Sequence, residues 1–248
     1  MRFFYLELNA FIVSGKKILN INKEKGFVFT SSWSLVEQFI NINENNYGLI
    51  KSNLKLIKES KILIDKDDIF KKVYDAFMVK IPLYENNNDY LIKIMNTIID
   101  SKNFNNIDTN TLNDIMKLKE IKNISIINNS KMYNDFLKNS RNIINNVFDE
   151  NFWYRMVFEL LVMTVKRGTN LSIEQIKEQY NGSLNRYIYA SAQFFGKNHK
   201  NDKNDFIDLE HYKYISNDII HMVSDDKIMK FYDKKRVYTV NEFLEYMK

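Results

Sequence analysis

The sequence contains no cysteine, one proline and six glycines. Without cysteine, disulfide bonds, cysteine-ligated zinc and thiol catalysis are excluded. Because residues that break helices are so scarce, long helices are expected through the middle of the chain. The sequence also lacks a glycine-rich phosphate loop of the Walker or GxGxxG type, so nucleotide-cofactor chemistry has no support.

Long apolar runs are missing as well. No stretch approaches the ~18 apolar residues of a membrane-spanning helix. The apolar segment 156–165 is interrupted by Glu159, which favours a buried helix. The first residues carry one basic side chain and place Glu7 inside an apolar run, which makes a poor signal peptide. We therefore expect a cytoplasmic protein without a membrane partner.

The composition is that of a folded protein. Of the 248 residues, 45% are hydrophobic and 27% are charged, which is sufficient for a packed core and predicts one large domain over 1–248. The net charge of +5 is compatible with a polyanionic partner. A composition rich in Asn, Lys and Ile explains the same charge without selection for function, so the charge carries little weight.

Patterns typical of strands lie toward both chain ends. The expected strands are 3–8, 27–30, 219–223 and 236–239. Helices are expected at 33–42, 67–78, 89–101, 111–119, 131–147, 150–166, 172–180, 183–195, 205–215, 225–232 and 241–247. This order predicts an α/β fold with a parallel sheet formed from both chain termini, 1–42 and 203–248, and a large helical insertion at 43–202.

Acidic residues recur where these expected elements begin or end. They are Glu7, Glu37, Asp208 and Asp226, with Asp205 one helical turn before Asp208. Open α/β folds keep their sites at the carboxyl ends of the strands. Carboxylates gathered there need protons or a hard cation such as Mg²⁺ or Mn²⁺ to coexist. The pattern indicates a metal-dependent phosphodiester hydrolase.

In chain order, the motifs resemble those of PIN-domain ribonucleases. They are Leu6-Glu7-Leu8-Asn9, Thr30-Ser-Ser-Trp-Ser-Leu-Val-Glu37, Asp208, Ser224-Asp225-Asp226, and a closing strand and helix at 236–244. The resemblance covers 1–42 and 203–248. The chain departs from the family in having Glu7 where Asp is usual, and in the 170 residues between Glu37 and Asp208.

The resemblance implies a PIN-like sheet and a metal-dependent endoribonuclease. Glu7, Asp208 and Asp226 would bind Mg²⁺ or Mn²⁺, and Glu37 would complete the catalytic site, with Asn9, Asp205, Ser224 and Asp225 in support. The metal would activate water and stabilise charge on the scissile phosphate of RNA. By analogy with the family, such an enzyme belongs to a toxin or defence system, has an inhibitory antitoxin-like partner and can form a homo-oligomer.

Plainer alternatives exist for each feature. The acids can serve as helix caps or as exposed helix residues. A PIN-like chain can be an inactive scaffold that binds RNA or protein, which Glu7 would explain. The resemblance can also be accidental in a mostly helical interaction protein. Finally, a basic stretch with interleaved aromatic residues predicts RNA contacts, and the alternative is two amphipathic helices with solvated charges. The candidate RNA-binding cations in this stretch are Arg186, Lys197, Lys200 and Lys203.

Overall fold

The structure is a computed structural model. It describes 2–67, 69–80, 89–140, 149–197, 208–215, 219–226, 229, 233 and 236–248. For 124–130, 132–140 and 197 it describes the backbone alone. Asp205, Lys200 and Lys203 therefore lie outside the described residues, as does the side chain of Lys197.

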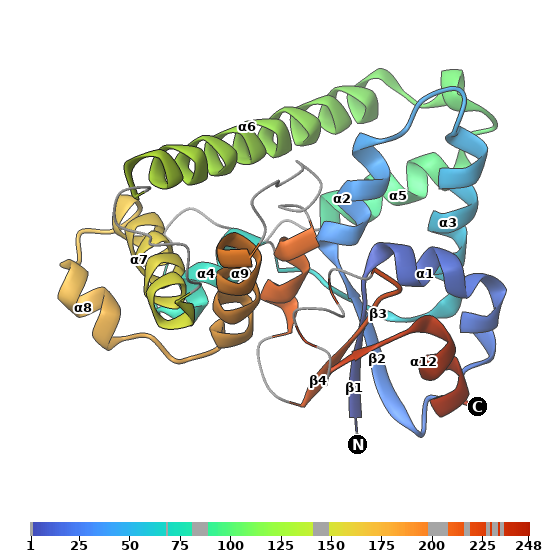
Figure 1. The fold of residues 1–248 in the computed structure, drawn as a ribbon. Coiled ribbons are helices and arrows are strands. Elements are labelled where there is room, and N and C mark those ends of the chain that lie inside the picture. The colour runs from blue at the N-terminus through green and yellow to red at the C-terminus, as the bar shows by residue number, and fades with distance from the viewer. Residues whose placement is uncertain are drawn as a thin grey trace. The chain divides into compact units, whose positions relative to one another are not determined.

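The described residues form a five-stranded, all-parallel sheet in the order β3-β2-β1-β4-β5 (Figure 1). The strands are β1 (Arg2–Leu6), β2 (Gly26–Ser31), β3 (Leu63–Asp65), β4 (Ile220–Val223) and β5 (Val237–Tyr238). Strand β1 pairs with β2 on one side and with β4, more than two hundred residues later, on the other. An α/β fold with a parallel sheet that joins both chain termini is thus confirmed, whereas its PIN-like assignment stays a prediction.

Strand β3 corrects the prediction that 43–202 is wholly helical. It pairs in parallel with β2, with Phe29 opposite Leu63 and Ser31 opposite Asp65. Its apolar run, 62–64, is too short for sequence periodicity to separate strand from helix. The preceding helix also ends without a glycine, because Lys61 itself adopts the left-handed conformation with a φ of 50°.

The chain divides into two compact units. Unit 1 comprises 1–68, 84–119 and 218–248 and holds the sheet, whereas unit 2 comprises 69–83 and 120–217 and is helical in its described parts. The segment 43–67 and the helix that begins at Asp89 therefore belong with the sheet rather than with a separate insertion. That the whole chain is one domain stays a prediction.

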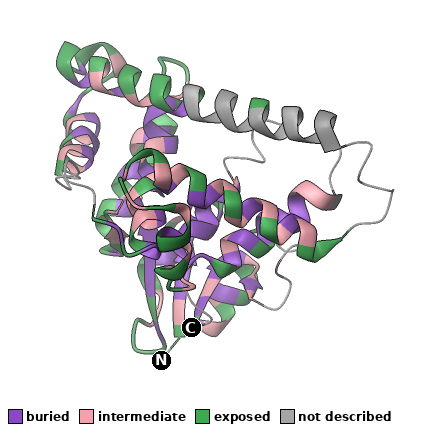
Figure 2. Ribbon diagram, turned by 90° about the vertical axis from the view of Figure 1, so that its left-hand side faces the viewer, coloured by how far each residue is buried: buried purple, intermediate pink, exposed green. Residues whose placement is uncertain are grey.

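One face of the sheet carries the hydrophobic core of unit 1. Phe4 and Leu6 alternate with Phe3 and Tyr5 along β1 and join Val28 and Val223 in one buried cluster. The helices that contribute to this cluster are α1 (Leu8–Ser14), α2 (Ser32–Ile40), α3 (Tyr47–Ser60), α5 (Asp89–Asp100) and α12 (Val240–Tyr246). Two short 3-10 turns complete unit 1, η1 (Gly15–Asn20) and η2 (Phe104–Asn106). Figure 2 shows the strands as largely buried.

Unit 2 has its own core. Its helices are α4 (Ile69–Ala76), α7 (Glu150–Arg167), α8 (Ile173–Glu178), α9 (Asn185–Lys197) and the 3-10 turn η3 (His211–Tyr214). Phe77 packs on Tyr180 at 4.9 Å between ring centroids, and Val162 and Ile188 are fully buried beside them. Among the described helices, none is both long and apolar enough to cross a membrane.

Helix α6 (Thr109–Ser140) corrects a second prediction. Two helices, 111–119 and 131–147, were expected, but one continuous helix of 32 residues runs from Thr109 to Ser140, and 141–147 lies outside the described residues. Asparagine costs less than about 0.7 kcal/mol in a helix relative to alanine, and no glycine or proline interrupts this segment. The helix starts in unit 1 and ends in unit 2.

Other expected elements match the structure more closely. The helices predicted at 67–78, 89–101, 150–166, 172–180 and 183–195 are confirmed as α4, α5, α7, α8 and α9 with shifted ends. Ser31 caps α2, since its hydroxyl accepts from the Ser34 N–H. Thr239 caps α12, because Thr239 and Glu242 form a reciprocal capping box.

The left-handed Lys61 gives a stability prediction. A non-glycine residue there costs about 1–2 kcal/mol, whereas glycine adopts this conformation freely but loses more entropy on folding. We expect Lys61→Gly to raise the free energy of unfolding by about 0.5–1 kcal/mol in urea denaturation. The matched change Lys55→Gly, inside α3, should lower it by about 1 kcal/mol. A loss of stability in Lys61→Gly would contradict this reading.

Candidate active site

The strand order creates a switch point between β1 and β4. From β1 the chain passes to β2 and β3 on one side of the sheet, whereas β4 and β5 lie on the other. Ligand sites of open α/β sheets lie outside the carboxyl ends of the strands at such a point. Leu6 pairs with Val223, so the next residues, Glu7 and Ser224, leave the sheet beside each other.

Glu7 is buried and serves as a helix cap. The strand ends at Leu6, two residues earlier than predicted, and Leu8 begins α1. The two carboxylate oxygens of Glu7 accept from the backbone N–H groups of Asn9 and Ala10, each at 2.9 Å. The predicted supporting residue Asn9 thus contributes its main chain, while its side chain is exposed.

Hydroxyl groups fix the end of β2 against the end of β1. The Thr30 hydroxyl donates to the Leu6 carbonyl at 2.9 Å, and the oxygens of Tyr5 and Ser31 are 2.8 Å apart. Ser34, in the first turn of α2, lies 3.2 Å from the Thr30 hydroxyl. This network sets the direction in which α2 leaves the sheet.

The placement of α2 determines the position of Glu37. It lies three residues after Ser34, so the two side chains share one face of the helix, and Glu37 is buried at 7% exposure. The alternative that Glu37 is an exposed helix acid is therefore wrong. A buried carboxylate on the face that begins at the strand ends is a sound candidate for a site residue.

The segment after β4 carries the second acidic motif. Ser224 is fully buried, its N–H donates to the Tyr238 carbonyl at 2.9 Å, and its hydroxyl accepts from the Asp226 N–H at 3.0 Å. The Asp225 carboxylate accepts from the Val240 N–H at 2.9 Å and so holds the start of α12. Asp226 is half-buried, which leaves it as the better ligand candidate of the two.

The remaining predicted residues lie in the other unit. Asp208 is half-buried at the start of a short helical stretch, 208–210, that continues into η3. Because Asp208 belongs to unit 2, its position as a ligand beside Glu7 and Asp226 stays a prediction. Arg186 is buried on α9, whereas a phosphate contact needs an accessible guanidinium.

Sequence reasoning missed an acid at a third strand end. Asp65 is the last residue of β3, and its carboxylate accepts from the Asp67 N–H at 3.1 Å. The Asp67 carbonyl in turn accepts from the Ser32 hydroxyl at 3.0 Å, which ties this turn to α2. The signal was present in the sequence, since three apolar residues at 62–64 precede Asp65.

The chemistry of these groups suits a hard cation. The described part of the chain contains no group of three or more His, Asp and Glu side chains that could hold one metal ion together. Mg²⁺ keeps several waters, however, and usually needs only one or two protein carboxylates together with substrate phosphates. Glu7 and Asp226, which follow neighbouring strands, supply two carboxylates of the kind that such a Mg²⁺ site uses.

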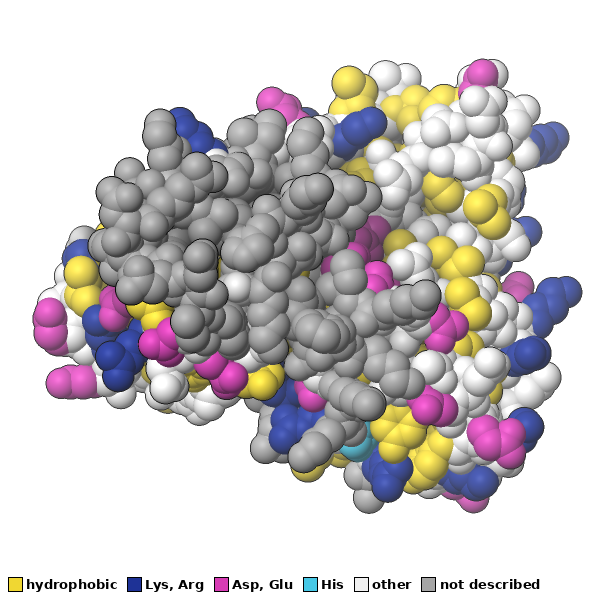
Figure 3. Space-filling model, viewed as in Figure 1, with side chains coloured by type: hydrophobic (Ala, Val, Ile, Leu, Met, Phe, Trp, Pro, Cys, Tyr) yellow, Lys and Arg dark blue, Asp and Glu magenta, His cyan; other side chains and the backbone are white. Residues whose placement is uncertain are grey.

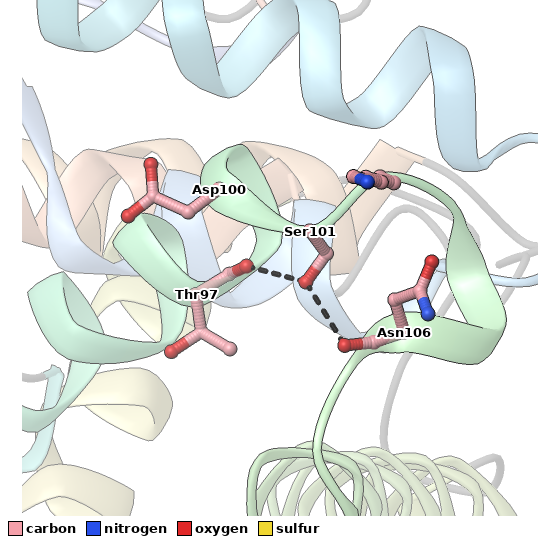
Figure 4. Close-up of a pocket in the computed structure, with 5 residues that line it drawn as sticks. Thr97, Asp100, Ser101 and Asn106 are labelled. Carbon is pink, nitrogen blue, oxygen red and sulfur yellow. Dashed lines mark hydrogen bonds between the residues drawn. The ribbon is translucent and has the colours of Figure 1, made fainter.

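A shallow pocket in unit 1 lies at the end of α5. It is lined by Thr97, Asp100, Ser101, Lys102 and Asn106 (Figure 4). The Ser101 hydroxyl donates toward the Thr97 and Asn106 carbonyls, and Tyr47 and Lys51 contact the Ser101 carbonyl. These polar groups close the helix end, and none of the residues predicted for the site lines this pocket.

Comparison of the chain with protein-family models, characterised proteins and solved structures gave no significant match.

Next to Asp208, unit 2 contains a buried ion pair. The Lys213 ammonium lies 2.5 Å from the Glu210 carboxylate, both side chains are about 10% exposed, and Lys213 also stacks over the Tyr187 ring. Burial opposes the charge on Lys213, but Glu210 and Tyr187 outweigh it, so the pKa of Lys213 is raised. Burial also raises the pKa of Tyr187.

This pair predicts a large mutational effect. Lys213→Met leaves the Glu210 carboxylate buried without its partner, so the free energy of unfolding should fall by about 3–5 kcal/mol. The double variant with Glu210→Gln should regain most of that loss. Because the folded pKa of Lys213 is raised, its contribution is complete below the unfolded value of about 10.4 and is lost as pH rises through the folded value. Denaturation curves that extend from pH 9 to above the unfolded value of about 10.4 would show the onset of this alkaline loss in the wild type and not in the double variant.

The cap at Glu7 gives a second stability prediction. Glu7→Ala removes two acceptors from the start of α1 and should lower the free energy of unfolding by about 1–2 kcal/mol. Glu7→Gln keeps one acceptor oxygen and should cost less. The control Glu24→Ala alters an exposed acid and should stay within about 0.5 kcal/mol of wild type. Equal stability of Glu7→Ala and Glu24→Ala would show that the cap does not matter.

Proposed function

We propose that this protein is a PIN-like, Mg²⁺- or Mn²⁺-dependent endoribonuclease. The observation that carries the proposal is the placement of a buried carboxylate, Glu7, and of Asp226 after the two central, register-paired strands at the switch point of a parallel sheet. Resemblance of the motifs to PIN-domain ribonucleases supplies the reaction class. The all-parallel sheet belongs to the α/β class that the resemblance implies.

In this proposal each group has a separate role. Glu7 and Asp226 hold the metal, which when bound supplies an activated water and neutralises charge on the phosphate. Glu37 orients metal-bound water from the buried face of α2, and Ser224 holds the backbone of Asp226. Asp208 enters as a ligand through the resemblance alone, as does an antitoxin-like inhibitory partner.

A second candidate function is an inactive PIN-like scaffold. It is favoured by one observation, the use of both Glu7 oxygens as acceptors for the start of α1. The N–H groups and the positive end of the helix stabilise the carboxylate without any metal. In that case the strand ends are retained for folding, and the protein binds RNA or a protein through other surfaces.

Cleavage of labelled RNA separates these functions. With a pool of single-stranded and structured RNAs, the wild type should cut in Mg²⁺ or Mn²⁺ and not in EDTA. Asp226→Asn should reduce the rate at least about 100-fold, because changes even to groups that only support metal ligands cost 10- to 100-fold. Asp208→Asn tests the ligand implied by resemblance in the same assay.

Two controls sharpen this test. Asp100→Asn removes an exposed acid of the same unit, at the pocket of Figure 4, and should cut at the wild-type rate. Calorimetric titration with Mn²⁺ should show binding to the wild type that is weakened in Asp226→Asn. A folded wild type that neither cuts RNA nor binds Mn²⁺ would replace the nuclease by the scaffold.

A further inference from the structure

A second surface of unit 1 has a cation fixed between aromatic rings. Arg2, the first residue of β1, donates from Nη1 to the Tyr238 hydroxyl at 2.7 Å. The guanidinium carbon of the same side chain lies 4.8 Å from the centre of the Tyr246 ring. Two contacts from β5 and α12 therefore hold the guanidinium plane in place.

The rings beneath Arg2 are themselves held in a cluster. Tyr246 and Tyr238 pack on buried Phe4, with centroid distances of 5.3 and 5.5 Å. His221, on β4, lies edge-on to Tyr238 at 5.2 Å. Figure 3 shows a histidine side chain beside basic and hydrophobic side chains, with acidic side chains nearby. The aromatic platform is thus anchored in the core, with Arg2 as its exposed outer layer.

The charges around the platform favour an anionic partner. Lys25 is exposed in the turn before β2, and the Tyr246 hydroxyl lies 3.5 Å from its carbonyl. The neighbouring acid, Glu245, is paired with Lys248, and this pairing lowers the pKa of Glu245. Arg2 and Lys25 thus place positive charge beside the aromatic rings, although the exposed acid Glu24 precedes Lys25.

We propose that Arg2 and Tyr246 form a stacking site for a base of single-stranded RNA. Unpaired bases stack on aromatic rings and on the planes of arginine guanidinium groups. Tyr246 covers one face of the guanidinium, the other face can receive a base, and N–H groups not used by Tyr238 can reach a phosphate. The choice of RNA rests on the proposed function.

The site lies away from the candidate active site. Arg2 begins β1 and Glu7 follows its end, so the two are separated by the length of a five-residue strand, roughly 16 Å. Arg2 would therefore bind a part of the strand other than the bond that is cut. Its role is to hold RNA, and its loss should affect binding without removing the cleavage chemistry.

Binding measured in EDTA tests this site independently of cleavage. Fluorescence anisotropy with a labelled oligouridine should show Arg2→Gln binding about tenfold more weakly than wild type, a loss typical of one stacked base. Arg2→Lys keeps the positive charge but removes the planar guanidinium group, so this variant should also bind oligouridine more weakly than wild type, nearly as weakly as Arg2→Gln. Lys17→Gln removes an exposed charge on η1 and should weaken binding far less.

An abasic strand of the same length separates stacking from charge. Wild type should bind it more weakly than oligouridine, and Arg2→Gln should cause little further loss on it. The proposal is overturned if either Arg2→Gln or Arg2→Lys binds oligouridine as tightly as wild type does. It is also overturned if polyglutamate of matched charge displaces the labelled oligouridine as well as unlabelled oligouridine does. Thermal melting of each variant would confirm that Arg2, an exposed residue, is not required for folding.

The results also separate this proposal from the nuclease. Metal-dependent cutting without any effect of Arg2 on binding would remove the stacking site and leave the nuclease. Arg2-dependent binding without cutting would establish the RNA site and remove the nuclease.

Discussion

Strand β1 is the constraint on which unit 1 depends. It is the central strand, paired with β2 on one edge and with β4 on the other. The second pairing closes a loop of more than two hundred residues, so it forms only after a large loss of chain entropy. Burial of Phe4, Leu6, Val28 and Val223 in one cluster offsets that loss. Both the candidate active site and the proposed stacking site are positioned by the two ends of this single strand.

The end of β1 combines a structural and a chemical requirement in one residue. Glu7 ends the strand, starts α1 and puts a buried carboxylate at the switch point. The extra methylene relative to Asp moves the carboxylate by ~1.5 Å, about one carbon–carbon bond. That length allows both oxygens to reach the N–H groups of Asn9 and Ala10. The same bonds limit how far the carboxylate can turn toward a metal, which is why metal binding and capping must be measured separately.

Much of the local structure was predictable. Gly26 followed by a β-branched and aromatic run, then by Ser31, indicated β2 and a capped α2, and both formed as expected. The strands near 220 and 237 were predicted from short apolar runs between polar residues. Helix α1, strand β3 and the unbroken helix α6 were not predicted. In each of these cases the sequence signal is short or weak, and packing against the sheet or the continuity of a long helix decided the outcome.

The candidate site also has features that the sequence predicted and features that only the structure revealed. Glu7 and Asp226 were predicted from their positions beside expected strands, because the end of a buried strand is visible in sequence as an acid at the end of an apolar run. Glu37 was predicted from its place on the helix after the second strand, through the resemblance. Their burial, the capping by Glu7 and the acid at Asp65 required the structure. No pattern in the sequence indicated the stack of Arg2 on Tyr246, since the two residues are separated by almost the whole chain.

The sequence by itself determined the class of fold and which polar residues follow each strand. It also determined that α6 is unbroken, because helix-breaking residues are scarce in this chain. Those are local properties, because hydrophobic period and backbone propensity act over a few residues. Only the tertiary structure decided which strands are neighbours, which acids are buried and which cation lies over which ring. Such facts depend on contacts between residues far apart in the chain, where side-chain packing and loop closure, rather than local preference, determine the free energy.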